Sequence, residues 1–173
     1  VMDTPLSVLV SSRDVEIDDE ESGASLALTP DARRLLRRTG EVYRYHAEYA
    51  WQLGDRHTLV PALGYLDYKL DGDAMAEDGL DLGLAYRYRG ARWQFSSSLY
   101  YRDLEADADN PIFGDAADRE VIGAILSASY PEPFGWKRWT ATARASWYDS
   151  DSDIDFYDES LGLFMLGATY RID

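Results

Sequence analysis

Residues that could do chemistry stand at every second position in several segments of this sequence. In EVYRYHAEYAWQL, which begins at residue 41, these are Arg44, His46 and Glu48. The same spacing recurs further along the chain, with Asp67, Lys69, Asp81, Arg87, Arg92, Arg102 and Arg144. Since alternate residues of a β-strand point to the same side, we expect all these side chains to share one face and to form a charge network there.

This predicted network offers little for catalysis. Hydrolysis by a serine or an activated water needs a histidine that a carboxylate or another polar group orients. The chain has two histidines, and His46 lies two residues from Glu48, but no serine stands near it in the sequence. His57 falls in a predicted turn. We therefore favour a packed, hydrogen-bonded His46 and predict no catalytic residue, with a lipid-modifying hydrolase as the alternative.

Acidic residues gather in the connecting segments. DGDAMAEDGLD, ADADNPIFGDAAD and DSDSDIDFYDE contain closely spaced carboxylates, including Asp151, Asp153 and Asp155. Such carboxylates can bind calcium, but none of these segments has the Asp-x-Asp-x-Asp-Gly order of an EF-hand. The pattern favours a solvated acidic surface, and divalent cation binding is the alternative. We predict no metal site and no cofactor.

Composition narrows the class of protein. A chain of 173 residues suits a single domain, here 1–173. Its formal net charge of -15 argues against a nucleic-acid partner. The absence of cysteine excludes disulfides and thiolate metal sites. Thirteen Tyr and five Trp are an excess of the aromatic types that suit an interface between apolar and polar surroundings.

The elements that position the charged residues are predicted to be strands. DGLDLGLAYRYR alternates Leu and Tyr with Asp, Gly and Arg, and similar alternation recurs to the end of the chain. In TLVPALGYLDYKL we expect the apolar even-numbered residues to face away from Asp67 and Lys69. Short connections alternate with long acidic ones. Seven strands follow residue 41, and SVLVSSRDVEI, near residues 7–17, supplies an eighth. We predict an all-β, antiparallel up-and-down barrel.

Aromatic residues near the predicted strand ends distinguish a membrane barrel from a soluble sandwich. They are Tyr43, Trp51, Trp93, Tyr130, Trp139 and Trp147. Small apolar side chains lie between them, as in the apolar band of a transmembrane barrel with its two aromatic girdles. A soluble sandwich would have to bury many phenolic hydroxyls, at about 1–3 kcal/mol for each one left unpaired. We therefore predict a transmembrane barrel with a charge-filled lumen. A soluble lipocalin-like or sandwich domain is the alternative.

Residues 18–40 are predicted to form an external loop that contains a short helix. In TPDARRLLRR, Thr29 is a suitable N-cap and Pro30 a suitable first helical residue. GASLAL could be a further strand in this loop. Val15 and Ile17 break the alternation of the first strand, so we expect a bulge there or an exit from the membrane.

The end of the chain carries the most specific motif. MLGATYRI resembles the C-terminal assembly signal of bacterial outer-membrane β-barrel proteins, with Gly167, Tyr170 and Ile172 in the glycine, aromatic and final apolar places. That family usually ends on Phe, whereas here Asp173 follows Ile172. The resemblance implies insertion by the barrel assembly machinery into the outer membrane of a Gram-negative bacterium. Membrane lipid and lipopolysaccharide would then surround the chain.

From these features we interpret the chain as a small integral outer-membrane barrel. Its expected role is structural or partner-binding, with a protein of the cell envelope as the partner and acidic loops outside the cell. The alternative is the terminal part of a larger translocation or transport pore. YDSDSDIDFYDESLGLFMLGATYRI resembles the last hairpin of barrels fused behind tetratricopeptide domains, such as the surface lipoprotein assembly modifiers.

Overall fold

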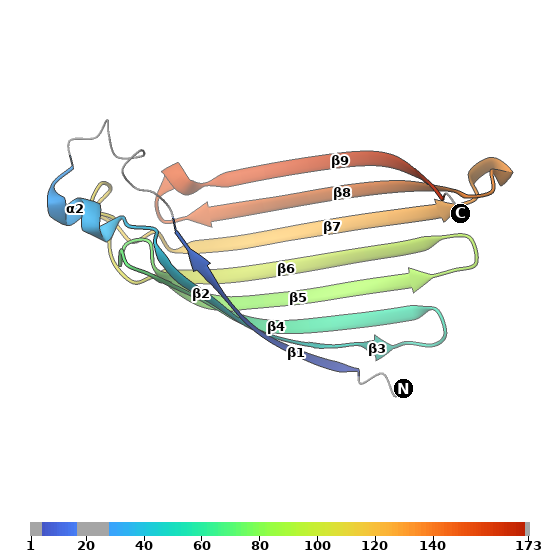
Figure 1. Cartoon of the computed structure of the whole chain (residues 1–173), viewed down its shortest axis with the longest axis horizontal. Coiled ribbons are helices and arrows are strands. Elements are labelled where there is room, and N and C mark those ends of the chain that lie inside the picture. Colours follow the sequence, from blue (N-terminus) through green and yellow to red (C-terminus); the bar gives the residue numbers. More distant parts are fainter. Residues whose placement is uncertain (1–4, 17–27, 172–173) are drawn as a thin grey trace.

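The computed structural model describes residues 5–16 and 28–171, whose strands form one antiparallel sheet (Figure 1). In chain order the strands are β1 (Leu6–Val15), β2 (Gly40–Tyr49), β3 (Trp51–Gln52), β4 (His57–Leu70), β5 (Glu77–Arg89), β6 (Gln94–Ala106), β7 (Arg119–Pro131), β8 (Trp139–Ser152) and β9 (Glu159–Tyr170). Apart from the short β3, which pairs with β4, each strand pairs with the next along the chain. The predicted all-β, up-and-down topology is confirmed.

The sheet is open, with β1 at one edge and β9 at the other (Figure 1). No hydrogen-bonded register joins these two strands within the described residues. Both strands are exposed along almost their whole length, on both faces of the sheet. The structure therefore confirms the sheet of the predicted barrel and the order of its strands.

The cross-strand register sorts side chains onto two faces, because residues directly opposite each other in an antiparallel pair point to the same side. The leucine face is the one that carries Leu82 and Leu84, and the arginine face is the one that carries Asp81. Besides Asp81, the charged residues of the arginine face are Arg13, Arg44, Glu48, Glu77, Arg87, Arg89, Arg102, Arg119, Arg144 and Glu159.

The arginine face is the more covered of the two. Val60, Leu66 and Asp81 are only 4–5% exposed on it, whereas Leu82 and Leu84 of the leucine face are 40% and 44% exposed. Side chains crowd together on the inner side of a curved sheet and spread apart on the outer side. The curvature of the sheet is therefore toward the arginine face.

For one strand, β4, the faces predicted from the sequence are reversed. The register sets Tyr45 opposite Tyr65, so the odd-numbered residues of β4 lie on the leucine face. Asp67 and Lys69 lie there too, and the prediction that they join the charge network is wrong. The even-numbered residues, such as Val60, line the arginine face instead. Because β4 is apolar on both sides over most of its length, its alternation could not distinguish one face from the other.

The N-terminal region contains β1 and the helix α2 (Pro30–Leu35). Thr29 caps α2 as predicted, since its hydroxyl accepts a hydrogen bond from the Ala32 N–H at 3.3 Å. The expected bulge at Val15 is not found, because β1 pairs with β2 in one continuous register through that residue. Ile17 and most of GASLAL lie outside the described residues.

Gly123 of β7 gives room to an aromatic ring of the neighbouring strand. Tyr100 of β6 lies directly opposite, and a Cβ added at Gly123 would come within 2.3 Å of its ring. We expect Gly123→Val to lower the free energy of unfolding by about 1–3 kcal/mol, because the Tyr100 ring must leave its position. Urea-induced unfolding measures this value.

Gly162 of β9 supplies the matched control for that experiment, since nothing lies within 4 Å of a Cβ built there. The Gly162→Val variant should unfold at nearly the wild-type urea concentration. Equal unfolding free energies for the Gly123 and Gly162 variants would contradict the close contact with Tyr100.

Candidate functional site

A buried carboxylate lies at the centre of the arginine face. The Asp81 side chain, 6% exposed, accepts a hydrogen bond from Arg44 Nη2 at 2.6 Å and one from Arg102 Nε at 3.3 Å. The three residues come from β5, β2 and β6. A carboxylate this well covered is stable as an anion only beside positive charge, so the two arginines and Asp81 form one unit.

Gly64 of β4 makes this ion pair possible across an intervening strand. It lies between β2 and β5, directly opposite Asp81, and a Cβ added there would be 3.3 Å from the Asp81 Cβ. Without a side chain at Gly64, Arg44 can pass over β4 to reach Asp81. A second ion pair, Arg119 with Glu77, spans β6 in the same way nearer the long loops.

His46 is not part of a nucleophile and base pair among the described residues. Its Nε2 lies 3.8 Å from a carboxylate oxygen of Glu48, and its buried Nδ1 has no hydrogen-bond partner. The register places Ser7 and Ser11 of β1 diagonally across from it. Sequence reasoning missed these serines because they are far from His46 along the chain. Among the described residues, neither serine donates a hydrogen bond to the buried Nδ1 of the imidazole.

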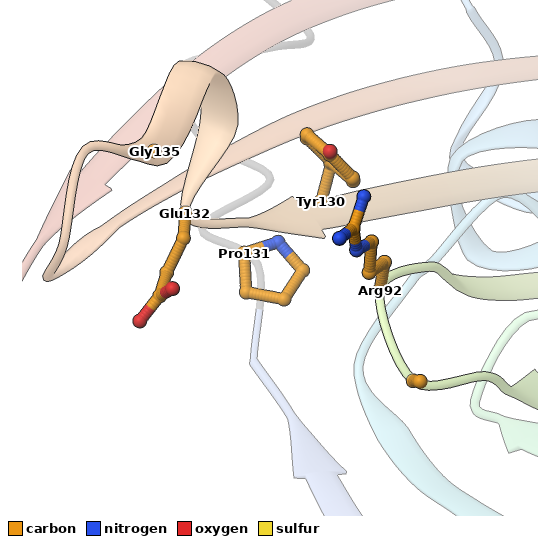
Figure 2. Close-up of a pocket in the computed structure, with 6 residues that line it drawn as sticks. Arg92, Tyr130, Pro131, Glu132 and Gly135 are labelled. Carbon is orange, nitrogen blue, oxygen red and sulfur yellow. The ribbon is translucent and has the colours of Figure 1, made fainter.

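The other predicted members of the charge network are dispersed. Arg87 and Arg144 are exposed on the arginine face and form no ion pair with any described residue. Arg92 lies in the turn between β5 and β6. It lines a depression of about 500 Å³ and extends toward Tyr130 (Figure 2). Among the described residues, the structure therefore brings together Arg44, Asp81 and Arg102. His46 with Glu48 is a separate pair, and so is Lys69 with Asp67, whose Nζ and carboxylate oxygen are 3.3 Å apart on the leucine face.

Most of the predicted girdle residues gather at the end of the sheet with the short connections. Trp51, Trp93, Tyr130 and Trp139 all lie there. The Trp93 and Tyr130 rings are 4.6 Å apart, and the Trp139 ring is 5.2 Å from that of Tyr170. Toward the other end, Tyr43 carries Lys69 over its ring, with Nζ 5.3 Å from the ring centroid.

Trp147 is the exception, because it lies in the interior of β8. The sequence predicted that this strand would stop at the acidic residues that follow Trp147. Instead β8 continues to Ser152, and its acidic residues, including Asp149 and Asp151, pair with β7.

Asp151, Asp153 and Asp155 are not gathered into one set of possible metal ligands in the structure. In the two described ranges of the chain, no group of three or more histidine, aspartate or glutamate side chains could hold a metal ion.

The predicted assembly motif lies on the edge strand β9. Gly167 belongs to the arginine face and Tyr170 to the leucine face, while Ile172 lies outside the described residues. From Leu161 to Leu166, β9 is apolar on both faces. In this stretch the arginine-face residues are Leu161, Leu163 and Met165, opposite Tyr148, Ser146 and Arg144 of β8.

The two ends of the sheet carry opposite charge. The long-loop end has the connections 71–76, 107–118 and 153–158, which together contain nine aspartates and no lysine or arginine. Among the residues that the structure describes, the short-turn end is basic, with Arg56, Arg89, Arg92, Lys137, Arg138 and Arg171 against Asp55 and Glu132. Helix α2 is the basic element of the long-loop end, with Arg33, Arg34, Arg37 and Arg38 in or just after it.

Within residues 5–16 and 28–171, no helix is long and apolar enough to span a membrane. A family model with the description "Protein of unknown function (DUF2860)" matches residues 1–171. The chain belongs to the DUF2860 family. The match includes every strand of the sheet, so both faces and the Asp81 ion pairs lie within the DUF2860 domain. A search of curated proteins found no match.

Proposed function

We propose that this DUF2860 chain is an integral β-barrel of the outer membrane of a Gram-negative bacterium, with a structural or partner-binding role. The observation that carries the proposal is the exposed leucine face. Leu84, Leu99, Leu126 and Phe164 are between 44% and 65% exposed on it. Soluble monomers rarely expose a continuous apolar surface of this kind, whereas lipid tails would cover it.

Pairing of β1 with β9 would close the sheet. The eight full-length strands alternate in direction, so β1 and β9 are antiparallel to each other. In lipid, each unpaired backbone N–H or C=O would cost several kcal/mol. Closure would also bring Leu161, Leu163 and Met165 of β9 and Leu9 of β1 onto the same face of one strand pair. All four side chains are about half exposed in the open sheet.

The closed barrel would have a filled interior. Eight strands leave an interior that side chains can fill, and here the Arg44, Asp81 and Arg102 unit would occupy its centre. This favours a structural or partner-binding role over transport and over lipid modification.

The two ends of the barrel would have different surroundings. Outer-membrane barrels place short turns in the periplasm and long loops outside the cell, so the acidic loops would be external. The α2 arginines are exposed, and they form no ion pair with the described residues. Guanidinium groups suit phosphate recognition. They would therefore contact lipopolysaccharide phosphates at the rim, while β9 would be the strand that the barrel assembly machinery engages.

Cysteine cross-linking tests both closure and location. The chain has no cysteine, so Val8→Cys in β1 can be combined in turn with Phe164→Cys, Leu166→Cys or Ala168→Cys in β9. At least one pair should link within a single chain when isolated outer membranes are treated with a short thiol-reactive linker. The product is detected by its altered gel mobility.

The control pairs Val8→Cys with Leu99→Cys of β6, which would lie across the barrel and should not link. Failure of every β1 and β9 pair, or links formed only between chains, would contradict the closed barrel. Absence of the chain from the outer-membrane fraction would contradict its location.

A further inference from the structure

Two loops that are distant in the sequence join at the long-loop end. They are 107–118 and the segment that contains the short helix η2 (Asp155–Tyr157). Asn110 is completely buried between them. Its Nδ2 donates a hydrogen bond to the Tyr157 hydroxyl at 3.0 Å, and its Oδ1 accepts one from the Ile112 N–H at 3.0 Å. The two loops therefore form one surface with a defined structure.

Apolar side chains on this surface are exposed to solvent. Ile112, Phe113 and Phe156, which we call the loop patch, are 48%, 44% and 76% exposed. The Phe113 and Phe156 rings stack with centroids 5.6 Å apart, and Tyr157 packs edge-on against Phe113 at 5.8 Å. Exposed aromatic residues on a supported surface are typical anchors of protein interfaces.

The charge of the two loops that form the loop patch has one sign. The two loops contain seven aspartates, Asp107, Asp109, Asp115, Asp118, Asp153, Asp155 and Asp158, and no lysine or arginine. None of these aspartates forms an ion pair with another described residue. A partner that covers the patch must therefore bring positive charge. Lipid phosphates would be repelled, so a lipid surface fits this site poorly.

We propose that the loop patch binds a cationic amphipathic polypeptide. Apolar side chains of the partner would cover Phe113 and Phe156, and its lysines or arginines would face the surrounding aspartates. This inference rests on the partner-binding role proposed above and specifies the chemical class of the partner.

The opposite end of the molecule provides a matched comparison. Phe134 and Trp136, in the connection between β7 and β8, are 88% and 59% exposed. They are followed in the sequence by Lys137 and Arg138. This second aromatic pair is as accessible as the loop patch but has basic neighbours. A cationic partner should avoid it.

The test uses the full chain in nanodiscs of neutral lipid, with empty nanodiscs as the blank. The probe is a synthetic amphipathic helical peptide of lysine and leucine, and calorimetry measures its affinity. We expect binding that weakens as salt is added. The double variant Phe113→Ser with Phe156→Ser should bind about tenfold more weakly or worse, the scale of losing an aromatic anchor. Phe134→Ser with Trp136→Ser should bind as the wild type does.

The single variant Phe156→Ser keeps the test informative if the double variant does not fold, because this side chain is the most exposed of the three. A glutamate and leucine peptide of the same length should not bind. Unchanged affinity in the Phe156 variant, equal binding of the two peptides, or an equal loss in the Phe134 and Trp136 variant would overturn the proposal.

Cross-linking of the same preparation distinguishes the two proposals. Peptide binding without a link between β1 and β9 would refute the closed barrel and leave the loop patch standing. A link between β1 and β9 without peptide binding would refute the loop patch alone.

Discussion

Replacing Asp81 by asparagine is expected to lower the free energy of unfolding by about 1.5–3 kcal/mol, the scale of a hydrogen bond to a charged group, because the two arginines left behind are 42% and 35% exposed. The substitution keeps the size of the side chain and removes its charge. Arg44 and Arg102, which both donate to Asp81, would then face each other on the covered side of the sheet without a counter-charge. Urea-induced unfolding of the purified protein, followed by tryptophan fluorescence, measures the loss.

Two further variants show whether the loss comes from unpaired charge. Asp103→Asn removes an exposed carboxylate that forms no ion pair with any described residue, and it should change the unfolding free energy by less than about 0.5 kcal/mol. Arg102→Met in the Asp81→Asn background should recover part of the loss, because one of the two unpaired cations is then gone. Equal effects of Asp81→Asn and Asp103→Asn would refute a central role for Asp81.

Replacing Leu84 by arginine is expected to disfavour the folded, inserted state by about 2–4 kcal/mol, the cost of a cation at the middle of the lipid-facing band of a barrel. Leu84 lies in the interior of β5 on the leucine face and is 44% exposed. On a soluble protein, a substitution at so exposed a site would change stability by only about 0.5 kcal/mol. Refolding into lipid vesicles, measured as the folded fraction on an unheated gel, separates the two cases.

Glu105→Arg is the matched control, since Glu105 is an exposed leucine-face residue at the long-loop end of β6. This variant should fold into vesicles as well as the wild type. Normal refolding of Leu84→Arg would mean that the leucine face does not contact lipid, and the membrane proposal would fail.

The fold was predictable wherever a strand is apolar on one side only. In β5, alternation of leucine or tyrosine with aspartate, glycine or arginine marked both faces correctly. In β4, Val60 and Leu66 are apolar on the covered face while Leu63 is apolar on the exposed one. Periodicity cannot show which face each residue of such a strand lies on. The pairing of the strand with its neighbours determines this. The acidic end of β8 was mistaken for a loop because aspartates are uncommon in strands.

The candidate site was predictable as a set of residue types, and its contacts were not. Alternation indicated that Arg44, Asp81 and Arg102 share a face. Their meeting depends on the register of three pairs of strands and on the missing side chain of Gly64, which a single sequence does not display. The contact between two loops through Asn110 and Tyr157 was not predictable either, because these residues are 47 positions apart and meet only in the folded chain.

The opposite charges of the two ends have a consequence for crowding. A molecule that is negative at one extremity and positive at the other behaves as an electric dipole along its strands. If many copies crossed one membrane in the same orientation, ends of the same charge would be adjacent. Neighbouring copies would then repel each other electrostatically. The spacing between copies would then follow the salt concentration, wide in dilute solution and narrow once the range of the repulsion falls to about 8 Å at physiological ionic strength.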